Sequence, residues 1–185
     1  MYKSETSKCR DRIAKYCVGN GVDLGYGGNP IVPSAITLDL DENDLKVGEA
    51  PLNLKGSAEN LYWFKNGVLD YVYSSHLLED FADTEKVLRE WLRVLKAGGL
   101  LVLFCPVEQV YRQYCEKHNQ PYNINHKIEN FSLEYVLGIL DSIGITKVIH
   151  SAGLADDYSF ELVVQKQGSN PVGVTGIEPF REDEE

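Results

Sequence analysis

The sequence predicts a single α/β domain built around a mainly parallel sheet, and three observations support this class. Short apolar strands alternate with helical segments along most of the chain, which is the pattern of layered α/β folds. The segment LLVLFC at residues 100–105 is an unbroken apolar run, typical of a strand covered on both faces. The length of 185 residues suits one domain with a substantial core and is too short for two ordinary ones.

Seven strands are expected from apolar runs bounded by turn residues. The fourth, for example, follows the turn signal Asn66-Gly67. The expected strands cover residues 22–25, 35–40, 52–56 (the weakest), 70–75, 100–105, 145–149 and 160–164.

Two helices have clear periodicity. The first is expected to begin at Asp83, which can cap its start, and to stop at Gly98-Gly99. It carries one apolar stripe, formed by Val87, Leu88, Trp91, Leu92 and Leu95. The second runs from Ser132 to Gly144 and buries Leu133, Val136, Leu137 and Leu140. The stretch 106–131 between them is expected to be irregular.

We expect residues 1–167 to form the domain. Residues 168–185 have no hydrophobic periodicity and end in an acidic run, so we expect a mobile acidic tail.

Composition argues against several classes of protein. The formal net charge of -10, with 18 scattered Lys and Arg residues, weighs against a nucleic-acid partner, because a phosphate backbone requires a concentrated basic surface. No stretch approaches the roughly 18–20 apolar residues of a membrane span, and the first residues lack the apolar core of a signal peptide. We therefore expect a cytoplasmic protein. The four cysteines show no spacing typical of a metal site, and none is predicted.

The segment GVDLGYGG at residues 21–28 places a strand directly before a glycine turn. Glycines there let a ligand approach the backbone with no Cβ in the way, and the N–H groups of such a turn favour an anionic group such as a carboxylate. A tight turn without a ligand is the alternative, since unrelated proteins use the same residues.

Two aspartates mark the end of the second expected strand. Asp39 is placed where a carboxylate can accept both hydroxyls of a ribose. Asp41 lies one pleat further on the same face and can assist or substitute, although a solvated loop acid is an equally good interpretation of Asp41.

Four blocks follow one another in order: VDLGYGG, AITLDLD, GSAENLYWFKNGVLDYVYSSHLLED and LREWLRVLKAGGLLVLFCP. With them the chain resembles the class I S-adenosylmethionine-dependent methyltransferases, in particular the compact group called type 11, over roughly residues 16–166. The resemblance implies a Rossmann-like, seven-stranded, mostly parallel sheet with an antiparallel last strand, and S-adenosylmethionine as the cofactor.

The resemblance also implies cofactor-binding roles. The methionine end would be held by Asp23, Gly25, Tyr26 and Gly27. The ribose would be bound by Asp39, beside Leu40. The adenine would be bordered by Ser57, Ala58 and Glu59, and the floor after the fourth strand would be lined by Ser75 and His76.

The glycine turn departs from the family pattern in two ways. Tyr26 stands where relatives carry a small residue or Cys, and we expect it to pack over the cofactor. Pro30 and Pro33 in the short connection GNPIVPS make a helix improbable, so the first crossover helix is expected to be shortened or missing. The interval of 12 residues from Gly27 to Asp39 also argues against a dinucleotide fold, whose ribose acid lies about 20 residues on.

Methyl transfer can rely mostly on positioning, and a base is needed only when the acceptor is protonated. The candidates are His76, Glu79, His118, Tyr122 and His126. His76 and His126 are the catalytic residues predicted, with simple packing as the alternative for each.

The function predicted is methyl transfer to a small molecule or a biosynthetic intermediate, such as a glycan or a lipid-linked precursor. The alternative is a non-catalytic, cofactor-binding partner or regulatory subunit. A third and weaker hypothesis is a methyltransferase that acts on protein or RNA. Because little sequence remains for a lid, we expect either a large acceptor that supplies its own cover or a second subunit that closes the site. Residues 106–131 are expected to order over the cleft when an acceptor binds or across a homodimer contact.

Overall fold

The computed structural model describes residues 4–40 and 48–168, which form a seven-stranded sheet in the order β3-β2-β1-β4-β5-β7-β6. Pairing is parallel from β3 to β5, and β7 runs antiparallel to both β5 and β6. The predicted Rossmann-like sheet with an antiparallel last strand is therefore confirmed. The strands are β1 (Gly21–Leu24), β2 (Ile36–Asp39), β3 (Leu54–Lys55), β4 (Leu69–Ser75), β5 (Leu95–Pro106), β6 (Thr146–Ala152) and β7 (Ser159–Lys166).

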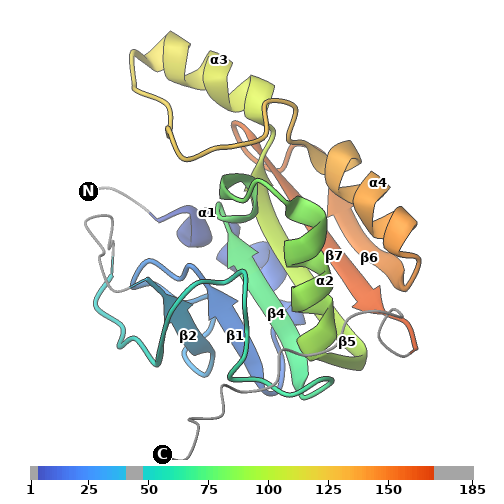
Figure 1. The fold of residues 1–185 in the computed structure, drawn as a ribbon. Helices are drawn as coiled ribbons and strands as arrows, with labels where there is room; N and C mark the ends of the chain where they lie inside the picture. Colours follow the sequence, from blue (N-terminus) through green and yellow to red (C-terminus); the bar gives the residue numbers. More distant parts are fainter. Residues whose placement is uncertain (1–3, 41–47, 169–185) are drawn as a thin grey trace, which may run out of the picture.

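Helices cover both faces of the sheet (Figure 1). α2 (Thr84–Val94) and α4 (Leu133–Ile143) pack on one face, where they bury the larger apolar cluster around Trp91. α1 (Glu5–Ile13) and the short helix η1 (Ala14–Tyr16) lie on the opposite face. There Cys9 and Ile13 pack with Tyr71, Tyr73 and Phe104. Because β1, β4 and the second half of β5 are covered on both faces, almost all of their residues are buried, including residues 101–106 of β5.

The first crossover helix is missing, as the prolines predict. Residues 25–35, between β1 and β2, form turns and bends. The Asp23 carboxylate accepts a hydrogen bond from the Ile31 N–H at 2.6 Å, which holds this connection against the sheet. The glycine turn is therefore followed by a short ordered loop.

The predicted end of the first long helix is wrong by one turn. α2 is capped by Asp83, as expected, but ends at Val94, and Leu95 is already extended. The Val94 carbonyl accepts a hydrogen bond from the Val68 N–H, and Leu95 pairs with Leu69 in the sheet. Pairing with β4 therefore ends the helix before Gly98-Gly99, which lie within β5.

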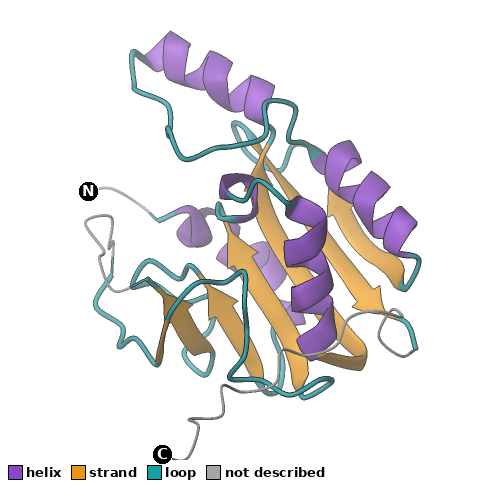
Figure 2. Ribbon diagram, in the orientation of Figure 1, coloured by secondary structure: helices purple, strands orange, loops and turns teal. Residues whose placement is uncertain are grey.

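The prediction of an irregular stretch over residues 106–131 is wrong in its first half. α3 (Glu108–His118) occupies it and stops at Asn119, which adopts the left-handed conformation. Figure 2 shows α3 projecting beyond the edge of the sheet. Only Glu108 and Cys115 of this helix are buried, so it lacks the apolar stripe by which helices are found in a sequence. The helix α1 escapes prediction for the same reason, since its sequence ETSKCRDRI is mostly polar.

α4 begins after Ser132, whose side chain accepts from the Tyr135 N–H, and ends at Gly144, which is left-handed. Both boundaries agree with the prediction.

Asp41 and the expected tail from residue 169 onward lie outside the described residues.

The cysteines at positions 9, 17, 105 and 115 are buried free thiols. Within residues 4–40 and 48–168 no group of three or more His, Cys, Asp or Glu side chains is placed to hold a metal ion. None of the helices in these ranges is long and apolar enough to cross a membrane.

Candidate cofactor and transfer site

Two adjoining hollows lie where β1, β2 and β4 end, at the carboxyl edge of the sheet. Hollow A has a volume of about 310 Å³ and hollow B of about 250 Å³. They share five residues, namely Gly25, Asp39, Leu77, Asp80 and Asn125. Parallel sheets bind ligands at this edge, and the five shared residues place the two hollows side by side there. Together they are called the cleft.

The glycine turn borders both hollows. Gly25 has φ +68°, in the left-handed region that favours glycine. A Cβ built there would lie 3.0 Å from Leu77 Cδ2, so a side chain at this position would press on the opposite wall of the cleft. Gly27, with φ +55°, also lines hollow B.

Tyr26 lies within the glycine turn and is buried. Its side chain lines hollow B, and its hydroxyl donates a hydrogen bond to the Ala50 carbonyl at 2.9 Å. The Gly28 carbonyl accepts from the Ala50 N–H in the same place. Tyr26 therefore ties the glycine turn to the segment that begins at residue 48.

Asp39, at the end of β2, lines both hollows. Its Oδ2 accepts a hydrogen bond from the Gly27 N–H at 3.1 Å and its Oδ1 accepts from the Leu40 N–H at 2.8 Å. A carboxylate oxygen can accept more than one hydrogen bond, so Asp39 can brace the glycine turn and still accept from a ligand.

Asp23 is almost completely buried on β1 and belongs to the wall of neither hollow. Its Oδ2 accepts from the Ile31 N–H, whereas its Oδ1 has no hydrogen-bond partner among the described residues. Burial raises the pKa of this carboxyl to about 8. Asp23 therefore supports the glycine turn through its hydrogen bond with Ile31 and does not line the cleft.

The remaining residues predicted to bind the cofactor are divided between hollow A and the surface. Leu40, Ser57 and Ala58 line hollow A, together with Leu38 and Phe81. Glu59 is exposed and belongs to neither hollow; its N–H donates to Ser57 Oγ at 3.2 Å.

The last residue of β4, Ser75, and the residue that follows it, His76, line hollow B. Ser75 is buried, and its hydroxyl has no hydrogen-bond partner among the described residues. His76 follows with φ +50°, an uncommon conformation for a residue with a side chain, and it turns the chain from β4 across the cleft. An unpartnered buried hydroxyl in a cleft points to a ligand that would complete it.

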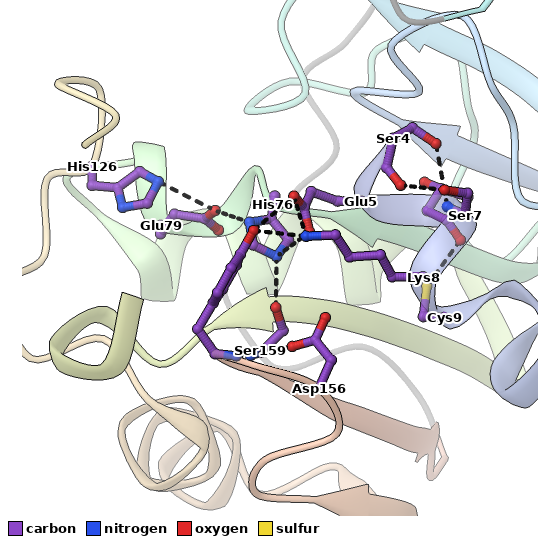
Figure 3. Close-up of polar contacts among 12 residues, drawn as sticks. Ser4, Glu5, Ser7, Lys8, Cys9, His76, Glu79, His126, Asp156 and Ser159 are labelled. Carbon is purple, nitrogen blue, oxygen red and sulfur yellow. Dashed lines mark hydrogen bonds and ion pairs between the residues drawn. The ribbon is translucent and has the colours of Figure 1, made fainter. Parts of the chain in front are cut away.

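The nitrogen atoms of His76 face other protein groups (Figure 3). Nε2 lies 3.0 Å from Ser159 Oγ and 3.4 Å from Glu5 Oε2, and Nδ1 lies 3.7 Å from Glu79 Oε1. Burial lowers the pKa of His76 to about 3. The imidazole is therefore neutral at physiological pH and is held in a polar cluster.

Glu79 separates the two predicted catalytic histidines (Figure 3). Its carboxylate is fully buried, and Oε1 lies 3.7 Å from His126 Nε2 as well as from His76. The other nitrogen of His126, Nδ1, lies 2.6 Å from Glu108 Oε2. His126 belongs to neither hollow. Burial raises the pKa of Glu79 well above its usual range.

The structure adds wall residues that sequence reasoning missed. They come from the N-terminal helix, from the turn after β4 and from the loop after α3: Ser4, Glu5, Thr6, Leu77, Asp80, Phe81, Asn123, Asn125 and Lys127. No local pattern identifies them, because three segments distant in sequence meet here. His118 and Tyr122 belong to neither hollow.

The chain is similar to known methyltransferases. Residues 18–103 match the model of a methyltransferase domain family. No curated protein sequence matches the chain.

Several solved structures share the fold. A S-adenosylmethionine-dependent methyltransferase from Archaeoglobus fulgidus aligns with a TM-score of 0.65 and 16% identity, over 87% of this chain and 94% of its own. A second such methyltransferase, from Thermotoga maritima, aligns with a TM-score of 0.62 and 18% identity, over 88% of this chain and 91% of its own. A complex of the Trm112 methyltransferase activator from Haloferax volcanii contains a chain that aligns with a TM-score of 0.61 and 16% identity, over 89% of this chain and 89% of its own.

Proposed function

We propose that this chain, a class I S-adenosylmethionine-dependent methyltransferase, holds its cofactor across hollows A and B and methylates a small molecule or a biosynthetic intermediate such as a glycan or lipid-linked precursor. One observation carries the proposal: two hollows meet at Gly25 and Asp39, which the family motifs place at the methionine end and at the ribose of the cofactor. The shared wall matches a ligand whose ribose joins an adenine to a methionine chain.

The residues present fit that ligand. Asp39 can accept the ribose hydroxyls while it still braces the turn. Leu40, Ser57 and Ala58 in hollow A border the adenine. The methionine end takes hollow B, where the wall is formed by Gly25, Tyr26, Gly27 and Ser75. Asp23 acts indirectly through the connection that it holds, and the exposed Glu59 contributes only its backbone N–H, which donates to Ser57 Oγ.

The bound cofactor supplies an electrophilic methyl group on a sulfonium. The protein contributes position and exclusion of water. Tyr26 and the segment from residue 48 close one side, and Asn123, Asn125 and Lys127 close another. His76 lines hollow B, while His126 reaches it only through Glu79. We assign both histidines as positioning residues that hold the turn after β4.

The acceptor is proposed to be small because the walls around hollow B come from the chain itself. The net charge of -10 disfavours polyanionic acceptors. A cytoplasmic location agrees with the predicted class of acceptor.

Calorimetric titration tests the proposal. S-adenosylmethionine and its demethylated product should each bind at one site, and NAD should not bind. Asp39→Ala should weaken binding by at least about tenfold, because buried ribose hydroxyls would lose their acceptor. The control is Glu59→Ala, which removes an exposed carboxylate outside both hollows and should leave affinity unchanged.

The results of these binding and activity measurements distinguish the alternative functions. Binding of NAD in place of the sulfur compounds would overturn the assignment of the cofactor site. Cofactor binding without methylation of any compound in a panel of metabolites, glycans and lipid-linked precursors would favour a non-catalytic subunit.

A further inference from the structure

Asp80 occupies the junction of the two hollows. It ends the short helix η2 (Leu78–Asp80), and its N–H donates to the Leu77 carbonyl, which fixes the turn. Of the five residues shared by hollows A and B, two carry a carboxylate, Asp39 and Asp80. Both therefore border the place where the cofactor passes from one hollow to the other.

The two carboxylates differ in their hydrogen bonding. Each oxygen of Asp39 accepts from a backbone N–H. The Oδ1 of Asp80 is buried and has no hydrogen-bond partner among the described residues. A buried acceptor without a donor costs free energy, and in a native cleft it calls for a ligand that donates to it. Asp80 is thus the carboxylate at the junction that has an oxygen without any hydrogen bond from the described residues.

The surroundings of Asp80 suit a group that accepts a proton. Burial raises the pKa of its carboxyl, and Glu108 acts in the same direction, whereas His126 and Lys127 partly oppose the shift. Lys127 lines hollow A, and its backbone N–H donates to the Glu79 carbonyl. The loop after α3 is therefore tied to the turn that carries Asp80.

The histidines are less well placed for this role. Both nitrogen atoms of His76 face protein groups, and His126 lies outside the walls of the cleft. Asp80 is the titratable side chain that borders both hollows and lacks a donor at one oxygen.

We propose that Asp80 is the catalytic residue at the point of transfer, facing the sulfonium methyl group and accepting the proton of an acceptor whose reacting atom is N–H or O–H. This inference rests on the proposed function. The acceptor atom forms its bond to the methyl carbon as the carbon–sulfur bond breaks, and that bond's electron pair stays on sulfur. The proton of the acceptor passes to the Asp80 carboxylate and then to solvent.

The test compares the positively charged cofactor with its neutral product, and it needs no knowledge of the acceptor. A carboxylate beside the sulfonium attracts S-adenosylmethionine but gains nothing from S-adenosylhomocysteine. Asp80→Asn should therefore weaken binding of S-adenosylmethionine roughly fivefold while affinity for S-adenosylhomocysteine stays constant. Asp80→Glu should restore part of the preference. Circular dichroism and thermal unfolding establish that each variant is folded.

Asp39→Asn is the matched control, because it removes the other shared carboxylate at the ribose and should weaken both ligands by the same factor. As a second measurement, the Asp80 carboxyl resonance, assigned by its loss in Asp80→Asn, should titrate at lower pH with S-adenosylmethionine bound than with S-adenosylhomocysteine. Equal affinity changes for the two ligands in Asp80→Asn, or the same titration in both complexes, would refute the role of Asp80. Failure of the wild-type chain to bind either ligand would instead refute the proposed function.

Discussion

Asp23 and Asp39 lie on neighbouring strands, yet the fold treats their carboxyl groups differently. Asp39 is half-buried and accepts two backbone N–H groups. Asp23 is buried, accepts one and has one oxygen without a partner. Desolvation therefore dominates at Asp23 and raises its pKa from 3.8 to about 8. The acid of the glycine motif is held by the protein as a group that readily keeps its proton.

This difference predicts how stability depends on pH. The folded-state pKa of Asp23 lies above its unfolded value, so the folded protein binds the proton more tightly than the unfolded chain does. The stability that this tighter proton binding contributes to the fold is lost as pH rises from 3.8 through about 8. Asp23→Asn removes this loss while the side-chain oxygen can still accept from Ile31. The variant should therefore gain stability relative to wild type as pH increases.

Urea unfolding at about pH 5 and about pH 9 measures the effect. Glu59→Gln serves as the control, because it neutralises an exposed carboxylate and should keep the pH dependence of the wild type. An unchanged pH dependence in Asp23→Asn would contradict the explanation by burial.

At the scale of elements, α2 stabilises a connection that has no helix of its own. The chain from β3 to β4 contains no α-helix. Arg93, buried on α2, donates to the Leu61 and Phe64 carbonyls and to Asn66 Oδ1. It also pairs with Glu90, whose Oε1 accepts from the Leu61 N–H. This cluster replaces the packing of a helix and positions the loop that carries Ser57 and Ala58 toward hollow A.

Arg93→Met should therefore destabilise the fold by about 3 kcal/mol, because it leaves Glu90 as an uncompensated, largely buried charge and several carbonyl groups without donors. Denaturant unfolding gives the free energy. Arg89→Met on the same helix is the control: Arg89 pairs with the more exposed Glu85, and its loss should cost less than about 1 kcal/mol. Similar losses in the two variants would show that the cluster is not what holds the loop.

At the scale of the whole molecule, the cleft is assembled from segments far apart in the chain. Residues 4–6 begin α1, residues 76–81 follow β4, and residues 123–127 follow α3. A ligand that contacts all three should stabilise them together, because binding energy favours the state in which they are assembled.

Hydrogen exchange tests this coupling. Addition of S-adenosylmethionine should slow exchange in residues 119–131 as well as in the glycine turn, and it should raise the midpoint of thermal unfolding. At ligand concentrations near 100 times Kd the added stability should be roughly 2.7 kcal/mol. Protection confined to the glycine turn would mean that the loop after α3 does not close on the cofactor. Slower exchange at higher protein concentration without ligand would instead indicate cover by a second copy of the chain.

Local chemistry explains what could be predicted. The apolar run at residues 100–105, the cap at Asp83 and the pair Ser132 and Gly144 each act within a few residues, and all appear in the structure as expected. Pro30 and Pro33 exclude a helix through their own backbone chemistry. The end of α2 could not be predicted in this way, since pairing with β4 determines it.

The class of fold, the glycine turn before a missing helix, and Asp39 at the end of β2 could all be predicted from the sequence, because period, caps and turn residues are properties of neighbouring positions. Which distant residues form the cleft follows from the folded chain alone. It placed Asp80 at the junction of the hollows, directed the nitrogens of His76 toward Glu79 and Ser159, and left Glu59 outside. Burial and the lack of a hydrogen-bond donor depend on every segment that packs around a group, so no single stretch of sequence encodes them.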